Sequence, residues 1–329
     1  MNNRAPFDFG GESGVAFFFV LSGFVLSLGY GGRVADGTFS TRRFFVNHWS
    51  RLYPLHLLTM AITVALDVRL GQTYALAQIV PNVLLVQTWL ASNYYVCVAN
   101  GVSWFLCDIL FFYLIFACLY RWLMHRSVGL LCLLGAVIVV AYVPLALLVP
   151  ADKVNHTLYD YPLLRVIDFS LGILLCRFYR SEWSVRLTAR VRSLGTAGAT
   201  CVEMLVPLVL FAAWAVYEPA NVGLRCASLF WPVMPLVVYV LAATDGAKGC
   251  MARLMNWRPL MWLGSISFEF YLVHIIMLRF MQHIMHLLLG EVTEMQVFVA
   301  AFFASIVAAY AAKRWFVNPV YGAMKRARQ

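Results

Sequence analysis

Arginine and histidine side chains crowd the start of one apolar segment, where they are suited to bind an anion. Arg42, Arg43 and Arg51 lie in the sequence RRFFVNHWSRLYPLH, which also contains His48 and ends at His56. A guanidinium group binds phosphate oxygens through paired hydrogen bonds. Apolar runs flank this cationic segment on both sides, so the arginines either bind an anionic ligand or only fix the orientation of membrane helices. The residues themselves leave both interpretations open.

Three ionisable residues inside apolar runs are candidate catalytic groups, namely His56, Asp108 and His274. Ionisable side chains are costly in a bilayer and tend to serve a function there. The competing interpretation for the histidines is a hydrogen bond between packed helices. Glu269 lies five residues before His274, which is about 140° around a helix. We therefore do not expect Glu269 to be the direct partner of His274.

The amino-acid composition indicates that these residues lie in a membrane protein. Hydrophobic residues make up 62% of the chain and charged residues 12%, whereas a soluble domain is about half apolar and about a quarter charged. Because lipid cannot satisfy backbone polar groups, the long apolar runs must be helices. We predict an all-α fold, a polytopic membrane helical bundle of about nine to ten transmembrane helices. Residues 1–329 are predicted to form a single membrane-embedded domain.

The distribution of basic residues predicts how these helices cross the membrane. Basic residues gather in alternate connections and in the carboxyl-terminal tail, which places the tail in the cytoplasm and the amino terminus outside. This alternation requires that the short run 79–91, interrupted by Pro81, Asn82 and Gln87, does not cross; we predict an interfacial or re-entrant piece on the outer side. The predicted spans are residues 13–30, 52–68, 104–123, 128–149, 162–178, 200–217, 226–243, 262–285 and 296–316.

The same features argue against two other classes of partner. The formal net charge is +10, but the arginines fall into separate clusters between apolar runs, so we do not expect nucleic acid to bind. The eight cysteines are scattered and show no spacing typical of metal ligands. We therefore expect no metal site.

Four segments in sequence order, FFFVLSGFVLS, RRFFVNHWSRLYPL, SWFLCDILFFYLIF and GSISFEFYLVHIIML, resemble the acyltransferase-3 family of integral membrane O-acyltransferases. The resemblance covers most of the chain. It implies an enzyme of the bacterial inner membrane that takes an acyl group, often acetyl, from acyl-coenzyme A. The acceptor would be a hydroxyl of an envelope carbohydrate or a lipid-linked glycan, and membrane lipids would surround the protein.

The resemblance also implies roles for single residues. Arg51 matches the family's RLxP element and, with Arg42 and Arg43, would bind the donor; His274 matches the YLxH element. Asp108 departs from the family pattern, because the family's acidic residue aligns with the next position, Ile109. A step of one residue rotates a side chain by about 100° around a helix, so Asp108 replaces that acidic residue only if the helix is locally adjusted.

The start of the chain departs from the family pattern as well. Family members typically begin with one more helix, which carries an arginine and a histidine that are both taken as catalytic. This chain begins with MNNRAPFDFGGESG directly before the FFFVLSGF segment. We therefore expect that the family's first helix is missing and that residues 1–329 alone show little acyl transfer.

Two other functions remain open at this point. Many spans with scattered polar residues would suit a transporter of small solutes, although the two halves show no repeat. A missing first helix would suit a catalytically inactive family member. Binding of acyl-coenzyme A distinguishes the enzyme from both, and uptake into vesicles identifies the transporter.

Overall fold

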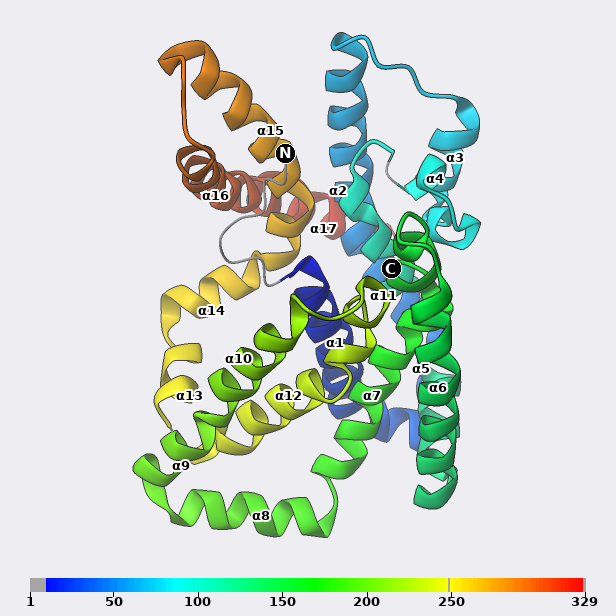
Figure 1. Ribbon diagram of the computed structural model, residues 1–329, viewed down its shortest axis with the longest axis vertical. Coiled ribbons are helices and arrows are strands. Elements are labelled where there is room, and N and C mark those ends of the chain that lie inside the picture. The colour runs from blue at the N-terminus through cyan, green and yellow to red at the C-terminus, as the bar shows by residue number, and fades with distance from the viewer. Residues whose placement is uncertain (1–9, 97, 248, 328–329) are drawn as a thin grey trace. The chain divides into compact units, whose positions relative to one another are not determined.

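The computed structural model describes residues 10–96, 98–247 and 249–327. Every regular element in this described part is a helix, so the predicted all-α class is confirmed (Figure 1). Seven of these helical segments are long and apolar enough to cross a bilayer: Gly11–Ala35, Thr41–Arg69, Gly101–His125, Val128–Leu148, Gly195–Tyr217, Ser267–Leu289 and Glu294–Arg326. The chain is a polytopic membrane helical bundle, as its composition predicted.

The two other predicted spans also fall on helices. Ser228–Thr244 is a shorter apolar helical segment. Helix α7, Pro162–Tyr179, has 18 residues but contains the charged side chains of Arg165, Asp168 and Arg177. With three charged residues among its 18, α7 has more charged residues than the apolar stretch of the same length in each of the seven candidate spans.

The chain divides into two compact units, which are described separately. Unit 1 comprises residues 1–41 and 111–256, and unit 2 comprises residues 42–110 and 257–329. The division at residue 110 falls within helix α5, Trp104–His125.

Unit 1 contains the greater number of helices, and its core lies where α1 packs against α7. A Cβ atom on Gly23 of α1 would collide with the carbonyl oxygen of Phe169, and one on Gly172 of α7 would collide with that of Val20. These glycines therefore let the two backbones touch, which is how small residues act between membrane helices. Besides the larger part of α5, the elements are α1 Gly10–Ala35, α6 Val128–Leu148, η3 Asn155–Tyr159, α7 Pro162–Tyr179, α8 Glu182–Ser193, α9 Gly195–Glu203, α10 Leu205–Tyr217, α11 Val222–Arg225, η4 Ser228–Phe230, α12 Val233–Thr244, η5 Asp245–Ala247 and α13 Cys250–Met255.

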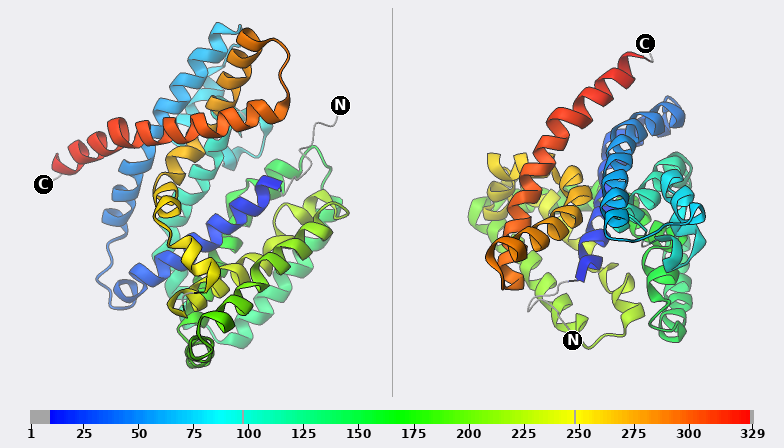
Figure 2. Two further views of the ribbon diagram at one scale, coloured as in Figure 1. Left: turned by 90° about the vertical axis from the view of Figure 1, so that its left-hand side faces the viewer. Right: turned by 90° about the horizontal axis from the view of Figure 1, so that it is seen from above.

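In unit 2, helix α15 packs closely against α16, and their facing rings include Phe270 and Phe302 at 5.8 Å between centroids. The helix that begins with α16 runs on through η6 into α17 as one long rod (Figure 2). Besides the first turns of α5, the elements are α2 Thr41–Arg69, α3 Leu76–Leu84, η1 Gln87–Leu90, α4 Asn93–Val96, η2 Gly101–Ser103, α14 Arg258–Ser265, α15 Ser267–Leu289, α16 Glu294–Ala311, η6 Ala312–Val317 and α17 Asn318–Arg326.

The segment between α2 and α5 does not span a bilayer, as predicted. Helix α3 has nine residues and is therefore only about 13 Å long, against about 30 Å of hydrocarbon. It ends at Leu85, whose backbone is left-handed with φ of 54°. We call residues 76–103, from α3 to η2, the re-entrant segment. Whether it lies at the interface or enters the membrane, and on which side, remains a prediction.

The predicted connection at residues 31–51 is wrong in its extent. Helix α1 continues to Ala35 and α2 already begins at Thr41, so Arg42, Arg43 and Arg51 lie on the first turns of α2 and not in a loop. The prediction ended each span at its last apolar residue, but a helix continues past the lipid boundary wherever its charged side chains reach water.

The expected absence of a first helix depends on residues 1–9, which lie outside the described residues. It remains a prediction.

Candidate active site

Fully buried polar side chains gather in unit 2, along the re-entrant segment and the helices beside it. Those with at most 1% of their surface exposed include His56, Asn82, Gln87, Thr88, Asn100, Ser103 and Asp108. Burying a polar group is costly unless it finds a partner, so this concentration requires an explanation. Within the described residues, the non-glycine residues with positive φ are Leu85, Ala91 and Ala99, all in the same segment. Such backbone conformations are uncommon and cluster at functional sites.

The ring of His56 is held in one orientation by the end of α3. Its Nε2 donates to the carbonyl oxygen of Asn82 at 2.9 Å, and the hydroxyl of Tyr53 donates to that of Val83 at 2.9 Å. The last carbonyls of a helix lack partners within it, so α3 offers these acceptors to α2. With the proton on Nε2, Nδ1 of the neutral ring carries a lone pair. This buried Nδ1 has no hydrogen-bond partner among the described residues.

Asn82 fixes the re-entrant segment around that histidine. Its side-chain Nδ2 donates to the carbonyl oxygen of Gln78 at 2.9 Å and to that of Tyr95 at 2.7 Å. The first bond lies within α3, whereas the second joins α3 to α4. The polar residues that interrupt the apolar run 79–91 therefore anchor the segment to itself and to α2.

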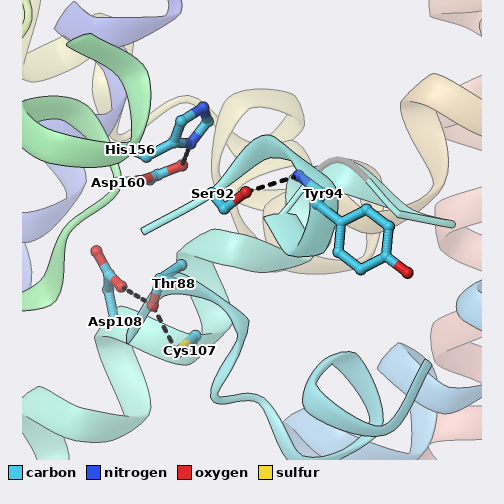
Figure 3. Close-up of polar contacts among 7 residues, drawn as sticks. All are labelled: Thr88, Ser92, Tyr94, Cys107, Asp108, His156 and Asp160. Atoms are coloured by element: carbon cyan, nitrogen blue, oxygen red, sulfur yellow. Dashed lines mark hydrogen bonds and ion pairs between the residues drawn. The ribbon is translucent and has the colours of Figure 1, made fainter. Parts of the chain in front are cut away.

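Asp108 is buried in the first turns of α5 and accepts a hydrogen bond from the re-entrant segment (Figure 3). The hydroxyl of Thr88 donates to its Oδ1 at 3.2 Å. The same hydroxyl lies 2.8 Å from Sγ of Cys107; because its own proton goes to Asp108, the thiol is the donor there. Ile109 is buried too, so burial does not decide between the two positions, but only Asp108 offers an acceptor for Thr88. Its role in catalysis remains a prediction.

His274 is half-buried on α15, close to where that helix meets the re-entrant segment. Its Nδ1 donates to the carbonyl oxygen of Tyr271 at 2.6 Å, which leaves Nε2 as the basic nitrogen. The segment is tied to α15 just before this point, since Asn100 donates to the carbonyl oxygen of Leu272 and the Tyr271 hydroxyl donates to that of Val102, both at 2.9 Å.

Glu269 is not hydrogen-bonded to His274, as the helical spacing predicted. Its carboxylate is buried, and both oxygens lack a hydrogen-bond partner in the described part of the chain. Its electrostatic neighbours are the positive charges of Lys313 and Arg51. Glu269 therefore connects α15 electrostatically to the arginine-bearing end of α2, a role that the sequence did not predict.

The three arginine side chains are exposed near the start of α2. Arg42, Arg43 and Arg51 are all exposed on its first three turns. An anionic ligand can reach exposed cations at the start of a helix. No group of acidic, histidine and cysteine side chains able to hold a metal ion occurs among the described residues.

Unit 1 contains a second set of buried ionisable groups, which the sequence reasoning missed. The Nη1 atom of Arg165 lies 3.2 Å from Oδ2 of Asp168, with both side chains fully buried, and it donates to the carbonyl oxygen of Cys226 at 3.1 Å. The guanidinium also lies over the rings of Phe19 and Tyr159, at 5.3 and 5.6 Å. The signal was present, because opposite charges three residues apart inside a predicted span require each other.

A histidine and a carboxylate lie just before that helix in the same unit. Nδ1 of His156 is 3.4 Å from Oδ2 of Asp160, and Figure 3 draws this contact. Burial raises the pKa of Asp160 to about 7, although the charge of Arg165 opposes this shift. Burial also lowers the pKa of His156. Both shifts favour the uncharged forms.

Comparison with known proteins decides between the acyltransferase and the transporter that the sequence left open. The family model described as "Acyltransferase domain", Acyl_transf_3, matches residues 2–314. The chain belongs to the acyltransferase-3 family. It is 28% identical over 293 residues to "Acyltransferase MdmB" of Streptomyces mycarofaciens, covering 84% of this chain and 70% of that protein. A shorter match, 43% over 51 residues, joins it to "Protein 2 in picA locus" of Rhizobium radiobacter and covers 16% of this chain and 27% of that protein. No solved structure matches.

The protein is therefore a multi-pass membrane acyltransferase. In this acyltransferase, unit 2 contains every candidate residue that the sequence singled out. Helix α2 carries Arg42, Arg43, Arg51 and His56, whereas Asp108 and His274 lie on α5 and α15 and are hydrogen-bonded to other partners. The residues that the sequence missed are Asn82 and Thr88, which hold His56 and Asp108, and the buried Glu269.

Proposed function

We propose that this acyltransferase moves an acyl group from acyl-coenzyme A to a hydroxyl of an envelope carbohydrate or lipid-linked glycan, with His56 as the general base. The observation that carries this proposal is the buried Nδ1 of His56, which has a fixed lone pair and no partner among the described residues. A buried polar atom without a partner in the protein requires an explanation, and a bound ligand is one such explanation. A substrate hydroxyl is the donor that this nitrogen would accept.

The donor would bind at the start of α2. Arg42, Arg43 and Arg51 offer planar guanidinium groups for its phosphates, and their predicted side is the cytoplasm, where acyl-coenzyme A is made. Arg51 and His56 are five residues apart, which is about 7.5 Å along the helix axis and about 140° around it. The donor would therefore pass from the exposed face of α2 at Arg51 to the buried face at His56. A donor with its phosphates at Arg51 has an extended arm that can carry the thioester this far.

Acyl transfer requires a general base and hydrogen-bond donors that stabilise the oxyanion. The acceptor oxygen attacks the carbonyl carbon of the thioester while His56 Nδ1 takes the hydroxyl proton. The carbon–sulfur bond then breaks, and the departing thiolate of coenzyme A takes the proton from the imidazolium. Buried amides such as that of Gln87 are suited to stabilise the oxyanion. In this scheme Asp108 positions the re-entrant segment through Thr88 and does not touch the substrate.

His274 is the second candidate for the base. Its Nδ1 is also anchored on a carbonyl oxygen, so Nε2 is free to accept a proton, and its half-exposed ring is easier for a substrate to reach. Two histidine variants decide between the candidates.

The experiment uses the full chain in lipid nanodiscs, with labelled acetyl-coenzyme A and a lipid-linked saccharide fraction from a bacterial inner membrane. We expect His56→Gln to lower the rate of acyl transfer about 10²- to 10⁴-fold, the usual contribution of a general base. His125→Gln is the matched control, because His125 is exposed at the end of α5 in unit 1. A normal rate for His56→Gln with a lost rate for His274→Gln would reassign the base to His274. This proposal departs from the expectation, drawn from the sequence, that residues 1–329 alone show little acyl transfer. Transfer by the unmodified chain would overturn that expectation, and no transfer with any acceptor would contradict the proposed function.

A further inference from the structure

A polar cleft lies in unit 2 at the end of α2 that is remote from the arginines. It has a volume of about 630 Å³ and lies between the end of α2 with its following turn and the last turns of α15. Its lining is largely polar: Asp67, Gln72, Tyr74, Arg279, Gln282 and His283 are among the residues that border it. This volume falls within the range of about 300–1,000 Å³ that is typical of small-molecule sites.

An apolar groove adjoins this cleft. It has a volume of about 250 Å³ and is lined by Thr63, Leu66, Ile275, Ile276 and Phe280, among others. The two cavities share four lining residues, Asp67, Leu70, Arg279 and His283. The polar cleft therefore continues directly into an apolar one.

Some polar side chains of the cleft are hydrogen-bonded to each other, and others have donors and acceptors that a ligand can use. Arg279 lies 3.3 Å from Oδ1 of Asp67, and the hydroxyl of Tyr74 donates to the other carboxylate oxygen. These contacts hold the two helix ends together. The side chains of Gln72, Gln282 and His283 take part in no hydrogen bond with the described residues, so their donors and acceptors are available to a ligand.

The charges in the cleft favour a neutral polar ligand over an anion. Asp67 offsets the charge of Arg279, and Arg69 lines the groove but not the cleft. The remaining groups are amides, imidazoles and a phenol, which both donate and accept hydrogen bonds. Vicinal hydroxyl groups have the same two-way character, so they match this lining better than a phosphate does.

We propose that the cleft and groove form the entry site for an amphiphilic acceptor, with a polyhydroxylated head in the cleft and an apolar part in the groove. This proposal rests on the proposed function for the word acceptor, but not for the binding itself. Thr63 borders the groove and lies seven residues after His56 on the same face of α2, where Thr59 is also buried. That spacing corresponds to about 10 Å, and Asp67 of the polar cleft lies about 16 Å after His56 along the same helix. The site therefore holds the acceptor away from the transfer point, and its head must move toward His56 to react.

Photochemical labelling tests the site without requiring turnover. The full chain in lipid nanodiscs is irradiated with octyl glucoside that carries a diazirine in its tail, and the labelled peptides are identified by mass spectrometry. We expect adducts within residues 63–74 and 275–286, and we expect Gln282→Ala or His283→Ala to lower their yield about fivefold, the effect of one lost hydrogen bond. His125→Ala, the matched control, should leave the yield unchanged.

Three comparisons make the outcome decisive. Ile276→Trp should fill the groove and abolish labelling, provided that gel filtration and thermal unfolding show the variant to be folded. Diazirine-labelled octanol should label these residues far less than the glucoside; equal yields would show that the groove takes any lipid chain and would overturn the proposal. Adducts only elsewhere, or full labelling of the Gln282→Ala and His283→Ala variants, would overturn it too.

The same experiment separates this proposal from the proposed function. Labelling is measured in the absence of acyl-coenzyme A, so a protein that binds the glucoside but transfers no acyl group supports the site and contradicts the enzyme mechanism. A protein that transfers acyl groups but is not labelled here contradicts the site alone.

Discussion

The two units bury ionisable and polar side chains in different ways, and the difference distinguishes structural groups from chemical ones. In unit 1, the charge of Arg165 is matched by Asp168, by a carbonyl oxygen and by two aromatic rings. In unit 2, His56 is anchored through one nitrogen and leaves the other without a partner among the described residues. Arg165 and Asp168 lie on the same helix, α7, and offset each other's charge, although Nε and Nη2 of Arg165 and Oδ1 of Asp168 also lack hydrogen-bond partners among the described residues. The ring of His56 needs no opposite charge, so its unused lone pair is suited to a substrate.

The largest expected effect is on stability, and it tests the role of the buried Arg165–Asp168 pair of unit 1. Arg165→Met leaves Asp168 as an uncompensated buried carboxylate and should lower the free energy of unfolding by about 3–5 kcal/mol. The measurement is thermal unfolding of the purified protein in detergent. The double variant Arg165→Met/Asp168→Leu removes both charges and should recover most of the loss. A single variant as stable as the parent protein would show that the pair does not hold unit 1 together.

The second effect concerns the pH dependence of unit 1. Because the pKa of Asp160 is raised to about 7 in the folded protein from about 4 in the unfolded chain, the folded state binds its proton more tightly. The stabilising contribution is therefore full below about pH 4 and is lost as the pH rises through about 7, with a magnitude of up to about 4 kcal/mol.

We expect Asp160→Asn to remove this decrease in unfolding midpoint between pH 5 and pH 8. The lowered pKa of His156 acts in the opposite direction, since its contribution is present above its ordinary value near 6.5 and is lost as the pH falls. His156→Gln should therefore steepen the decrease that Asp160 causes. An Asp160→Asn protein with the parent's pH profile would exclude this carboxyl as its origin.

A smaller effect tests whether the arginines at the start of α2 in unit 2 bind acyl-coenzyme A. Arg51→Ala should weaken binding of acyl-coenzyme A about tenfold or more, since a hydrogen bond to a charged group contributes about 1.5–3 kcal/mol. Arg51→Lys should recover only part of this affinity, because an ammonium lacks the planar fork. The matched control is Arg186→Ala, which removes an exposed arginine of unit 1. If Arg51→Lys binds as tightly as the parent protein, the arginine only sets membrane orientation.

The smallest effect concerns the positioning of the re-entrant segment. Thr88→Val removes the hydroxyl that donates to Asp108 and should cost about 1–3 kcal/mol of stability, measured by thermal unfolding. Thr196→Val on α9, whose exposed hydroxyl accepts from Arg253, should cost much less. An unchanged midpoint for Thr88→Val would show that this contact does not fix the segment.

The sequence predicted the helices better than it predicted their partners. Apolar length and the alternation of basic residues were enough to place each span and to show that residues 79–91 do not cross. The contact of His56 with Asn82, 26 residues later, depends on the left-handed turn at Leu85, and no hydrophobic period shows where a non-glycine residue adopts that conformation. The Thr88–Asp108 contact was missed for the same reason.

Two further errors have simple physical causes. The arginines were assigned to a loop because the spans were ended at the last apolar residue, although nothing in residues 41–51 stops a helix. Arg165 and Asp168 were overlooked because basic residues were considered only as orientation signals between spans. A pair of opposite charges inside a span is the stronger signal, since neither charge would be stable there alone.

The measurement that tests the account most directly compares donor binding and acyl transfer in two variants of α2. For His56→Gln and Arg51→Ala, the affinity for acyl-coenzyme A and the single-turnover rate at saturating donor are measured on the same nanodisc preparations. We expect His56→Gln to bind acyl-coenzyme A as tightly as the parent protein but to lose the single-turnover rate. We expect Arg51→Ala to bind it more weakly but to keep that rate. A His56→Gln protein that transfers the acyl group at the parent's rate would contradict this account.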